Sequence, residues 1–175
     1  WTKVNDTTWR FNLRQGVKFH DGSPFTADDI VFSIERAQHP HSLLRQYANL
    51  LGRPRKIDDH TVELTQQDPN PILLQHATLI YIMSKSWSAK HKVEQPLDFK
   101  SGQDSYAARH AMGTGPWILV SREPDVKTVL RRNPHWWDKY EGNVTEITYR
   151  PIQSDATRTA ALLSGQVDFV LDPPP

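Results

Sequence analysis

The chain has 175 residues, 37 % hydrophobic and 23 % charged, a composition typical of one globular domain or two small ones and not of a disordered or fibrous protein. Its 21 basic and 20 acidic side chains give a net charge of +1, which argues against a nucleic-acid partner and a polybasic membrane binder, since both need a dominant positive field. No cysteine occurs, so disulfides, thiolate metal sites and cysteine nucleophiles are excluded.

The first predicted element is a strand over residues 7–14, because Trp9, Phe11 and Leu13 alternate with polar side chains. A turn at residues 15–16 leads into a short extended piece at 17–19.

The next stretch, FHDGSPFTADDIVF at residues 19–32, places three acidic side chains and a histidine close together. We interpret it as the start of a helix and not as an active site. Thr26 is a good N-cap, and Asp29 stands three residues later, where a carboxylate reaches back to the cap's N–H. The helix is predicted to end at residues 38–40. His20 alone receives no structural role.

The middle of the chain predicts several short elements. They are a helix at 42–51, a hairpin at 56–66 turning at 58–59, a helix starting at 70–71, an apolar strand at 79–83, an exposed helix at 85–92 and an irregular linker at 95–111.

The last third predicts a second set of strands. They are a pair at 117–121 and 126–132, an aromatic-rich loop at 133–143, a strand at 144–152, a helix at 156–163 that Gly165 ends, and a final apolar strand at 167–171.

Three local patterns with possible chemistry are each better explained by structure. No G-x-S-x-G turn occurs, and the nearest match, LLSGQ, ends a predicted helix. The glycine-rich loop at 113–116 lacks the Lys-Ser/Thr ending of a phosphate cradle. His39 and His41 have no further ligands at zinc-like spacing. We therefore expect no catalytic residues, no metal site and no cofactor.

The aromatic run Trp136-Trp137 with Tyr140 has two possible interpretations. Such rings serve as stacking platforms for sugars or bases, and they also cover the end of a core. We favour packing, with ligand contact by one of the two tryptophans as the alternative.

Five motifs in order carry a family resemblance: K-F-H-D-G, T-A-x-D before a hydrophobic helix, G-T-G-P-aromatic, R-N-P-x-aromatic-W and G-x-V-D. Each is weak alone, but their order and spacing over essentially the whole chain are specific. The sequence resembles the family 5 extracellular solute-binding proteins of bacterial ABC transporters, the peptide, nickel and opine group.

The resemblance implies an α/β fold of the periplasmic-binding-protein type, class II and cluster C, with a mixed sheet and flanking helices. Residues 1–111 would be the inserted subdomain of the first lobe, and residues 112–175 part of that lobe's base. The chain opens on Trp1 and stops on three prolines, so we expect a fragment of a longer protein. The resemblance implies that the second lobe, normally C-terminal, is absent from it. Such a fragment would bind ligand weakly or not at all.

The resemblance also implies a function. The chain would belong to the substrate-binding component of an ABC importer for di- or oligopeptides, not an enzyme. It would be monomeric, without a nucleic-acid partner, and would deliver a peptide-like ligand to a membrane permease. Its place would be the periplasm, or a lipid anchor on the outer face of the cytoplasmic membrane. Alternatives are a cytoplasmic ligand-sensing regulatory module with the same fold, a hydrolase, or a binding protein for opines, oligosaccharides or nickel chelates.

Relatives imply three ligand-binding candidates, Tyr47, His76 and Tyr81, because two segments of the inserted subdomain tend to face the cleft. The structural alternative is that both tyrosines lie in the core and that His76 ends a helix. The nickel-chelate branch tends to offer arginine and tryptophan near residues 41–44 and 76–77, and this chain has neither there.

Overall fold

The computed structural model describes residues 1–98, 100 and 104–173. Its elements, in chain order, are β1 (Thr2–Asn5), β2 (Thr8–Asn12), α1 (Ala27–Gln38), α2 (Arg45–Asn49), β3 (Arg53–Asp58), β4 (Thr61–Thr65), α3 (Leu73–Ala77), α4 (Lys85–Lys90), α5 (Tyr106–Arg109), β5 (Trp117–Glu123), β6 (Lys127–Arg132), β7 (Glu146–Tyr149) and α6 (Asp155–Leu163).

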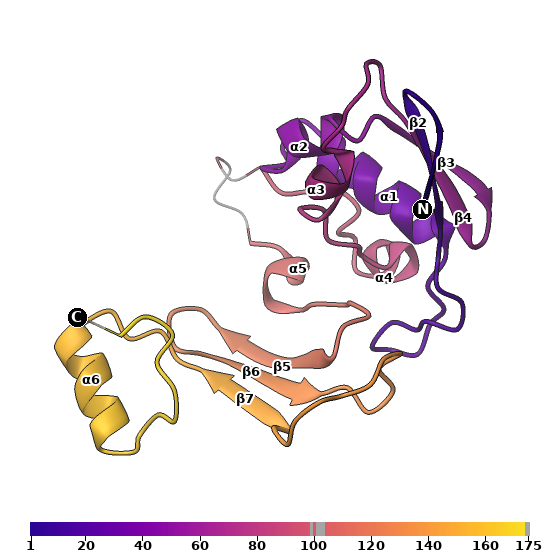
Figure 1. The fold of residues 1–175 in the computed structure, drawn as a ribbon. Helices are drawn as coiled ribbons and strands as arrows, with labels where there is room; N and C mark the ends of the chain where they lie inside the picture. The colour runs from indigo at the N-terminus through magenta and orange to yellow at the C-terminus, as the bar shows by residue number, and fades with distance from the viewer. Residues whose placement is uncertain (99, 101–103, 174–175) are drawn as a thin grey trace.

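The strands form two sheets. The N-terminal sheet has the order β1-β2-β4-β3 and the C-terminal sheet the order β5-β6-β7. Figure 1 shows the N-terminal sheet with α1 to α4 as one group, the C-terminal sheet below it, and α6 beyond that sheet. The α/β class is confirmed. The described strand pairings are all antiparallel and form two separate sheets, not one mixed sheet.

The core lies between α1 and one face of the N-terminal sheet. Val62 and Leu64 of β4 alternate onto this face, and Phe11 and Trp9 of β2 stand opposite them. Their neighbours in the core cluster come from α1, α2, α3 and the segment after it: Ile34, Ala37, Ala48, Leu51, Leu73 and Ile80. The alternation predicted for residues 7–14 and 56–66 is therefore confirmed.

The opposite face of this sheet carries a charged cluster. Glu63 is only 5 % exposed, yet Arg10 and Arg55 stand directly beside it on the two neighbouring strands. Each arginine places a guanidinium nitrogen 2.6 Å from a different Glu63 carboxylate oxygen. The arginines hold the pKa of Glu63 below its usual range, with hydrogen bonding to Arg10 the largest cause.

Helix α1 begins where the sequence predicts. Thr26 is the N-cap, and the Asp29 carboxylate accepts the Thr26 backbone N–H at 2.9 Å. Asp29 is 6 % exposed, and its other oxygen accepts the backbone N–H of Lys85 at 2.9 Å. The carboxylate therefore ties the start of α1 to the start of α4, a second function that its local spacing does not predict.

Several predicted elements are wrong. Segments 79–83 and 167–171 form no strand, because each lacks a neighbouring strand to pair with. The short extended piece predicted at 17–19 is consistent with the structure, where Lys18 makes an isolated bridge to Pro24. Helix α4 is only partly exposed, because Trp87 and Ser88 are buried. Strand β1 was not predicted, and the linker at 95–111 contains α5; residues 99 and 101–103 of it lie outside the described part of the chain.

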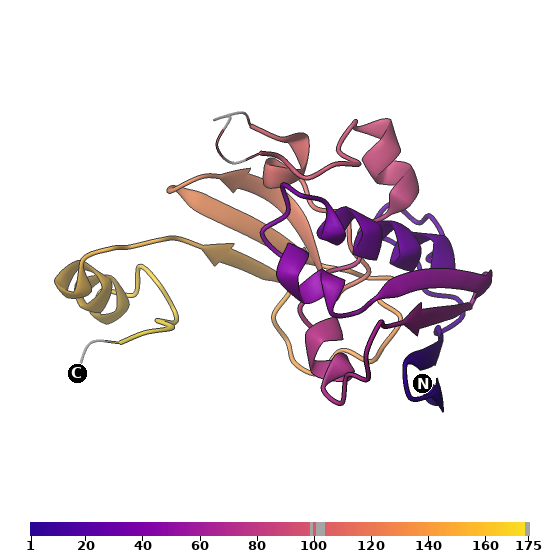
Figure 2. The same ribbon diagram turned by 90° about the horizontal axis from the view of Figure 1, so that it is seen from above.

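The C-terminal group, which consists of β5 to β7, α6 and the segments that join them, has few buried side chains. Among described residues from 112 onward, only Asn133 and Ala161 are buried. Both views place α6 at the end of the C-terminal sheet far from the N-terminal sheet (Figures 1 and 2). Large apolar side chains there are exposed, among them Val120, Leu163 and Phe169.

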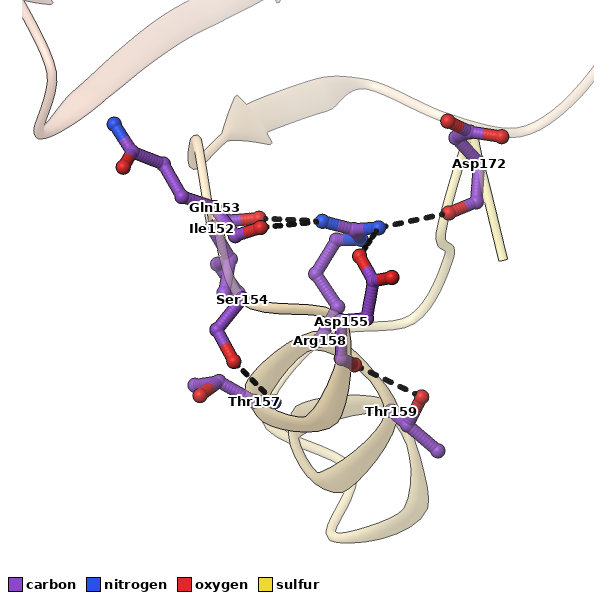
Figure 3. Close-up of polar contacts among 8 residues, drawn as sticks. All are labelled: Ile152, Gln153, Ser154, Asp155, Thr157, Arg158, Thr159 and Asp172. Carbon is purple, nitrogen blue, oxygen red and sulfur yellow. Dashed lines mark hydrogen bonds and ion pairs between the residues drawn. The ribbon is translucent and has the colours of Figure 1, made fainter. Parts of the chain in front are cut away.

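Arg158 of α6 forms hydrogen bonds with the chain on both sides of this helix (Figure 3). Arg158 donates to the carbonyl oxygens of Ile152 at 2.9 Å and Gln153 at 3.1 Å, before the helix. Its other terminal nitrogen contacts the Asp155 carboxylate at 2.5 Å and the Asp172 carbonyl oxygen at 3.3 Å. These contacts hold the chain after α6 against the turn that precedes it.

Candidate ligand groove

A groove of about 1070 Å³ lies where the N-terminal group meets the start of the C-terminal sheet. Its walls come from α1, the loop after α1, segment 80–83, α4, the segment around α5, and residues 110–117. This volume is at the upper end of what small-molecule sites enclose, so the groove has room for a ligand of several residues' size.

Three polar side chains of α1 hold one wall of the groove in place. Asp29, Ser33 and Arg36 stand at i, i+4 and i+7, so they share one face of the helix. Besides the bond from Asp29 to the Lys85 N–H, Ser33 Oγ accepts the N–H of Met83 at 2.8 Å, and Arg36 Nε donates to the carbonyl oxygen of Val93 at 3.1 Å.

These contacts fix the non-helical segment 80–84, and the chain after α4, against a rigid helix. Burial lowers the pKa of the Arg36 guanidinium, as expected for a side chain partly withdrawn from water.

Stacked rings join α5 to α4, and two of these rings, Trp87 and His110, line the groove. The Tyr106 ring of α5 lies parallel to the rings of His91 and His110, with centroid distances of 4.2 and 3.8 Å. Trp87 of α4 lies against both His91 and Tyr106, at 5.0 and 5.8 Å. These four rings form a ring ladder, which holds the single-turn helix α5 against α4.

The lining is mainly apolar, with few charged groups. Its larger apolar side chains are Leu43, Leu44, Ile80, Tyr81, Ile82, Met83, Trp87, Pro96, Leu97, Met112 and Trp117. The ionisable ones are His20, Arg36, His41, Asp104 and His110. Such a surface suits a ligand with apolar side chains and a few polar groups that fix its orientation. Over the described ranges, no three His, Asp or Glu side chains gather where a metal ion would fit.

The three residues suggested by resemblance lie in different places. Tyr81 lines the groove and is 81 % exposed. Tyr47, on the surface of α2, is outside the groove lining. His76, in α3, is half-buried, and its Nδ1 lies 3.1 Å from the Asn70 amide nitrogen, also outside the lining. A role in binding stays a prediction for all three.

Most lining residues were not singled out from the sequence. Trp87 and His110 belong to segments expected to be exposed or irregular, and Arg36 has no local pattern that marks it. His20, which had no structural role, lies at the groove, where its Nε2 contacts the carbonyl oxygen of Gly115 at 3.1 Å.

The aromatic loop lies beside a second hollow, of about 750 Å³, next to β6. Tyr140 meets both Trp117 and Trp136 edge-on, with centroid distances of 5.6 and 5.9 Å. The Arg132 guanidinium carbon lies 3.9 Å from the centre of the Tyr140 ring. The rings thus pack against one another and against β5, and ligand contact by either tryptophan of the 136–137 pair stays a hypothesis.

None of the helices in the described part of the chain combines the length and apolarity that a membrane span requires.

Comparison with known proteins agrees with the motif order. The family model of the bacterial extracellular solute-binding proteins, family 5 Middle, matches residues 1–175. The periplasmic oligopeptide-binding protein OppA of Salmonella typhimurium is 28 % identical over 188 aligned residues, which cover 97 % of this chain and 33 % of OppA. The chain thus spans about a third of the length of this relative.

Two solved structures show the same fold. The A. tumefaciens protein MoaA, in complex with mannopinic acid, superposes with a TM-score of 0.80 at 26 % identity, over 96 % of this chain and 33 % of MoaA. NikZ from Campylobacter jejuni, in complex with Ni(L-His), gives a TM-score of 0.80 at 21 % identity, over 94 % of this chain and 32 % of NikZ. Both matches likewise cover about a third of the neighbour.

Proposed function

The chain belongs to the bacterial extracellular solute-binding proteins of family 5, and on this premise we propose that it is part of the substrate-binding component of an ABC importer that captures di- or oligopeptides. The groove is the observation that carries the proposal, because its apolar lining with few charged groups suits peptide side chains and termini. The relative OppA, named for oligopeptide binding, supports the choice of peptides over other solutes.

In this proposal the groove binds its ligand and catalyses no reaction. Removal of apolar ligand surface from water supplies the driving force, at roughly 25 cal/mol per Å². The ionisable groups around the groove would orient the ligand's charged ends, because charge complementarity adds specificity more than affinity. In this proposal no residue of the groove acts as nucleophile, acid or base.

We further propose that residues 1–111 and 112–175 are two subdomains of one lobe. The separate sheets support this division, since β1 to β4 fall in the first part and β5 to β7 in the second. A groove built by one lobe buries only part of a ligand. The 175-residue chain alone is therefore expected to bind peptides weakly or not at all.

Mass spectrometry of ligands that co-purify with the full-length protein tests the substrate class. Peptides of a few residues are expected, and calorimetry with a synthetic copy should then give micromolar or tighter binding. Recovery of only sugars or metal chelates would refute the peptide proposal. Micromolar binding by the isolated 175-residue chain would refute the proposal that one lobe is insufficient.

Opines are the second candidate ligand class, because MoaA, solved with mannopinic acid, is 26 % identical over nearly the whole chain. A competition experiment separates the two classes. Excess mannopinic acid should leave peptide binding by the full-length protein unchanged, and displacement of the peptide would favour opines.

We propose that the protein works in the periplasm or on a lipid anchor outside the cytoplasmic membrane and delivers its ligand to a permease as a monomer. Relatives such as OppA, named as periplasmic, support this location. Cell fractionation of the source bacterium should recover the full-length protein outside the cytoplasm. Recovery from the cytoplasm would favour the ligand-sensing alternative.

A further inference from the structure

Three motif segments that lie far apart in the chain meet at the junction between the two groups. They are the F-H-D-G turn around His20, the glycine-rich loop at 113–116, and the loop that starts at Asn133 after β6. From the sequence, the first segment is predicted as a turn before a helix, and the second as a loop without a phosphate site. In the structure they form one hydrogen-bonded junction at the edge of the groove.

His20 contributes two bonds to this junction. Its backbone N–H donates to the carbonyl oxygen of Gly113 at 2.9 Å. Its ring Nε2 lies 3.1 Å from the carbonyl oxygen of Gly115, and because a carbonyl only accepts, Nε2 is the protonated nitrogen and the donor. Over the described residues the other ring nitrogen, Nδ1, is buried and has no hydrogen-bond partner. The side chain thus directs its one hydrogen bond to Gly115.

Asn133 holds the same loop from the other side. Its amide nitrogen donates to the carbonyl oxygen of Gly115 at 3.1 Å, and its backbone N–H donates to that of Pro116 at 2.7 Å. Asn133 is one of the few buried residues of the C-terminal group. The Gly115 carbonyl therefore accepts one donor from each group, and it joins the N-terminal turn to the first strand of the C-terminal sheet.

Few other contacts join the groups. Between described helices and strands of the two groups, the main packing is α5 against β5. Arg14 adds one more link, with its guanidinium carbon 4.5 Å from the centre of the Trp137 ring. Both Arg14 and His20 lie in the short segment between β2 and α1, so that segment makes most of the junction.

We propose that His20 is a positioning residue: its hydrogen bond to Gly115 sets the angle between the two groups and so the width of the ligand groove. The inference rests on the proposed function, since it assigns His20 an effect on ligand binding through Gly115 and Trp117. Trp117 follows the glycine-rich loop and lines the groove, as does segment 80–83. Without the bond from the His20 ring, Asn133 still holds the glycine-rich loop from the C-terminal side. The turn at His20 then keeps only the backbone bond from His20 to Gly113.

The test compares two substitutions in the full-length protein. His20→Gln keeps an N–H donor near the position of Nε2, whereas His20→Ala removes it. His135→Ala, at an exposed histidine of the C-terminal group, is the control. If His20→Ala fails to fold, His20→Asn replaces it, because its shorter amide does not reach Gly115.

The readout is a distance between the groups. Spin labels on cysteines placed at Val4 in β1 and Val120 in β5, both exposed, report the distance distribution, and these 175 residues contribute no competing cysteine. The parent, His20→Gln and His135→Ala should give the same narrow distribution. His20→Ala should broaden or shift it and raise the Kd for the tetrapeptide Ala-Leu-Ala-Leu about fivefold to tenfold, the equivalent of one neutral hydrogen bond.

A lower melting temperature for His20→Ala with an unchanged distance distribution and Kd would refute the positioning role. If distances shift as expected but no form of the protein binds the tetrapeptide or a co-purified peptide, the proposed function fails and the junction geometry stands. If peptide binding is intact in the parent and equal in all variants, the proposed function stands and the inference fails.

Discussion

Substitution of Gly52 by alanine should be among the most damaging single changes in the N-terminal group. Gly52 has a φ of +76°, and a Cβ placed on it would lie 2.1 Å from the backbone oxygen of Thr65 and 2.6 Å from its carbonyl carbon. These are backbone atoms of β4, so no side-chain rotation relieves the overlap.

The expected cost has two parts. A left-handed conformation costs an alanine about 1–2 kcal/mol. Forcing β3 and β4 apart to admit the methyl group adds about 1–3 kcal/mol, the usual range for overpacking. The shift also disturbs Gln38, whose amide donates to the carbonyl oxygen of Gly52 at 2.7 Å. Gly52→Ala should therefore lower the free energy of unfolding by about 2–5 kcal/mol, a large share of the roughly 5–15 kcal/mol that stabilises a typical domain.

Gly16→Ala is the matched control. Gly16 has nearly the same φ, +74°, but no atom lies within 4 Å of its hypothetical Cβ, so only the conformational cost remains. Urea titration of both variants in the full-length protein, followed by tryptophan fluorescence, measures the difference. Equal destabilisation by the two substitutions would refute the steric argument, because the backbone contact would then add nothing to the conformational cost.

Three further predictions follow from the same structure. Thr26→Ala should cost about 1 kcal/mol of unfolding free energy, the usual value of an N-cap, without changing which ligand the full-length protein selects; loss of ligand selection would contradict a purely structural role. Glu63 has a folded-state pKa below its unfolded value near 4.5, so its ion pairs stabilise the fold above that pH and are lost as pH falls through the lowered folded value. Glu63→Gln should therefore flatten the decline of stability in acid urea titrations, and an unchanged pH profile would contradict this. Tyr81→Ala should weaken peptide binding about threefold to tenfold with an unchanged melting temperature, because the ring is exposed in the groove. Tyr149→Ala, at an exposed ring of β7 outside the lining, is its control, and equal effects of the two would contradict the assignment.

The sequence predicts local features well because their causes are local. The start of α1 depends on Thr26 and Asp29, which are three residues apart, and the hairpin of β3 and β4 depends on a turn between alternating strands. Residues 79–83 have the composition of a strand but form none, since pairing needs a neighbour that composition does not supply. The same limit explains why residues 167–171 were predicted as a strand.

The groove is harder to predict, because contacts over long sequence separations assemble it. Arg36 reaches Val93 across 57 positions, and His20 reaches Gly115 across 95. Family resemblance pointed to Tyr81, which lines the groove, but also to Tyr47 and His76, which lie outside the lining. The ring ladder around Tyr106 depends on the packing of α5 on α4, and no spacing in the sequence predicts it.

Helix α1 links the stability of the fold to the shape of the groove. One face of α1 packs Ile34 and Ala37 into the core, and another carries the hydrogen bonds from Asp29, Ser33 and Arg36 to the groove wall. A wall fixed at three points to a helix that is itself fixed in the core has little freedom to move alone. Any change of groove width must then come from the other side, where few contacts join the C-terminal sheet to the N-terminal group. The contacts of His20 and Arg14 are among the few that join the two groups, so their loss is expected to change the groove width, whereas the α1 wall is expected to keep its place.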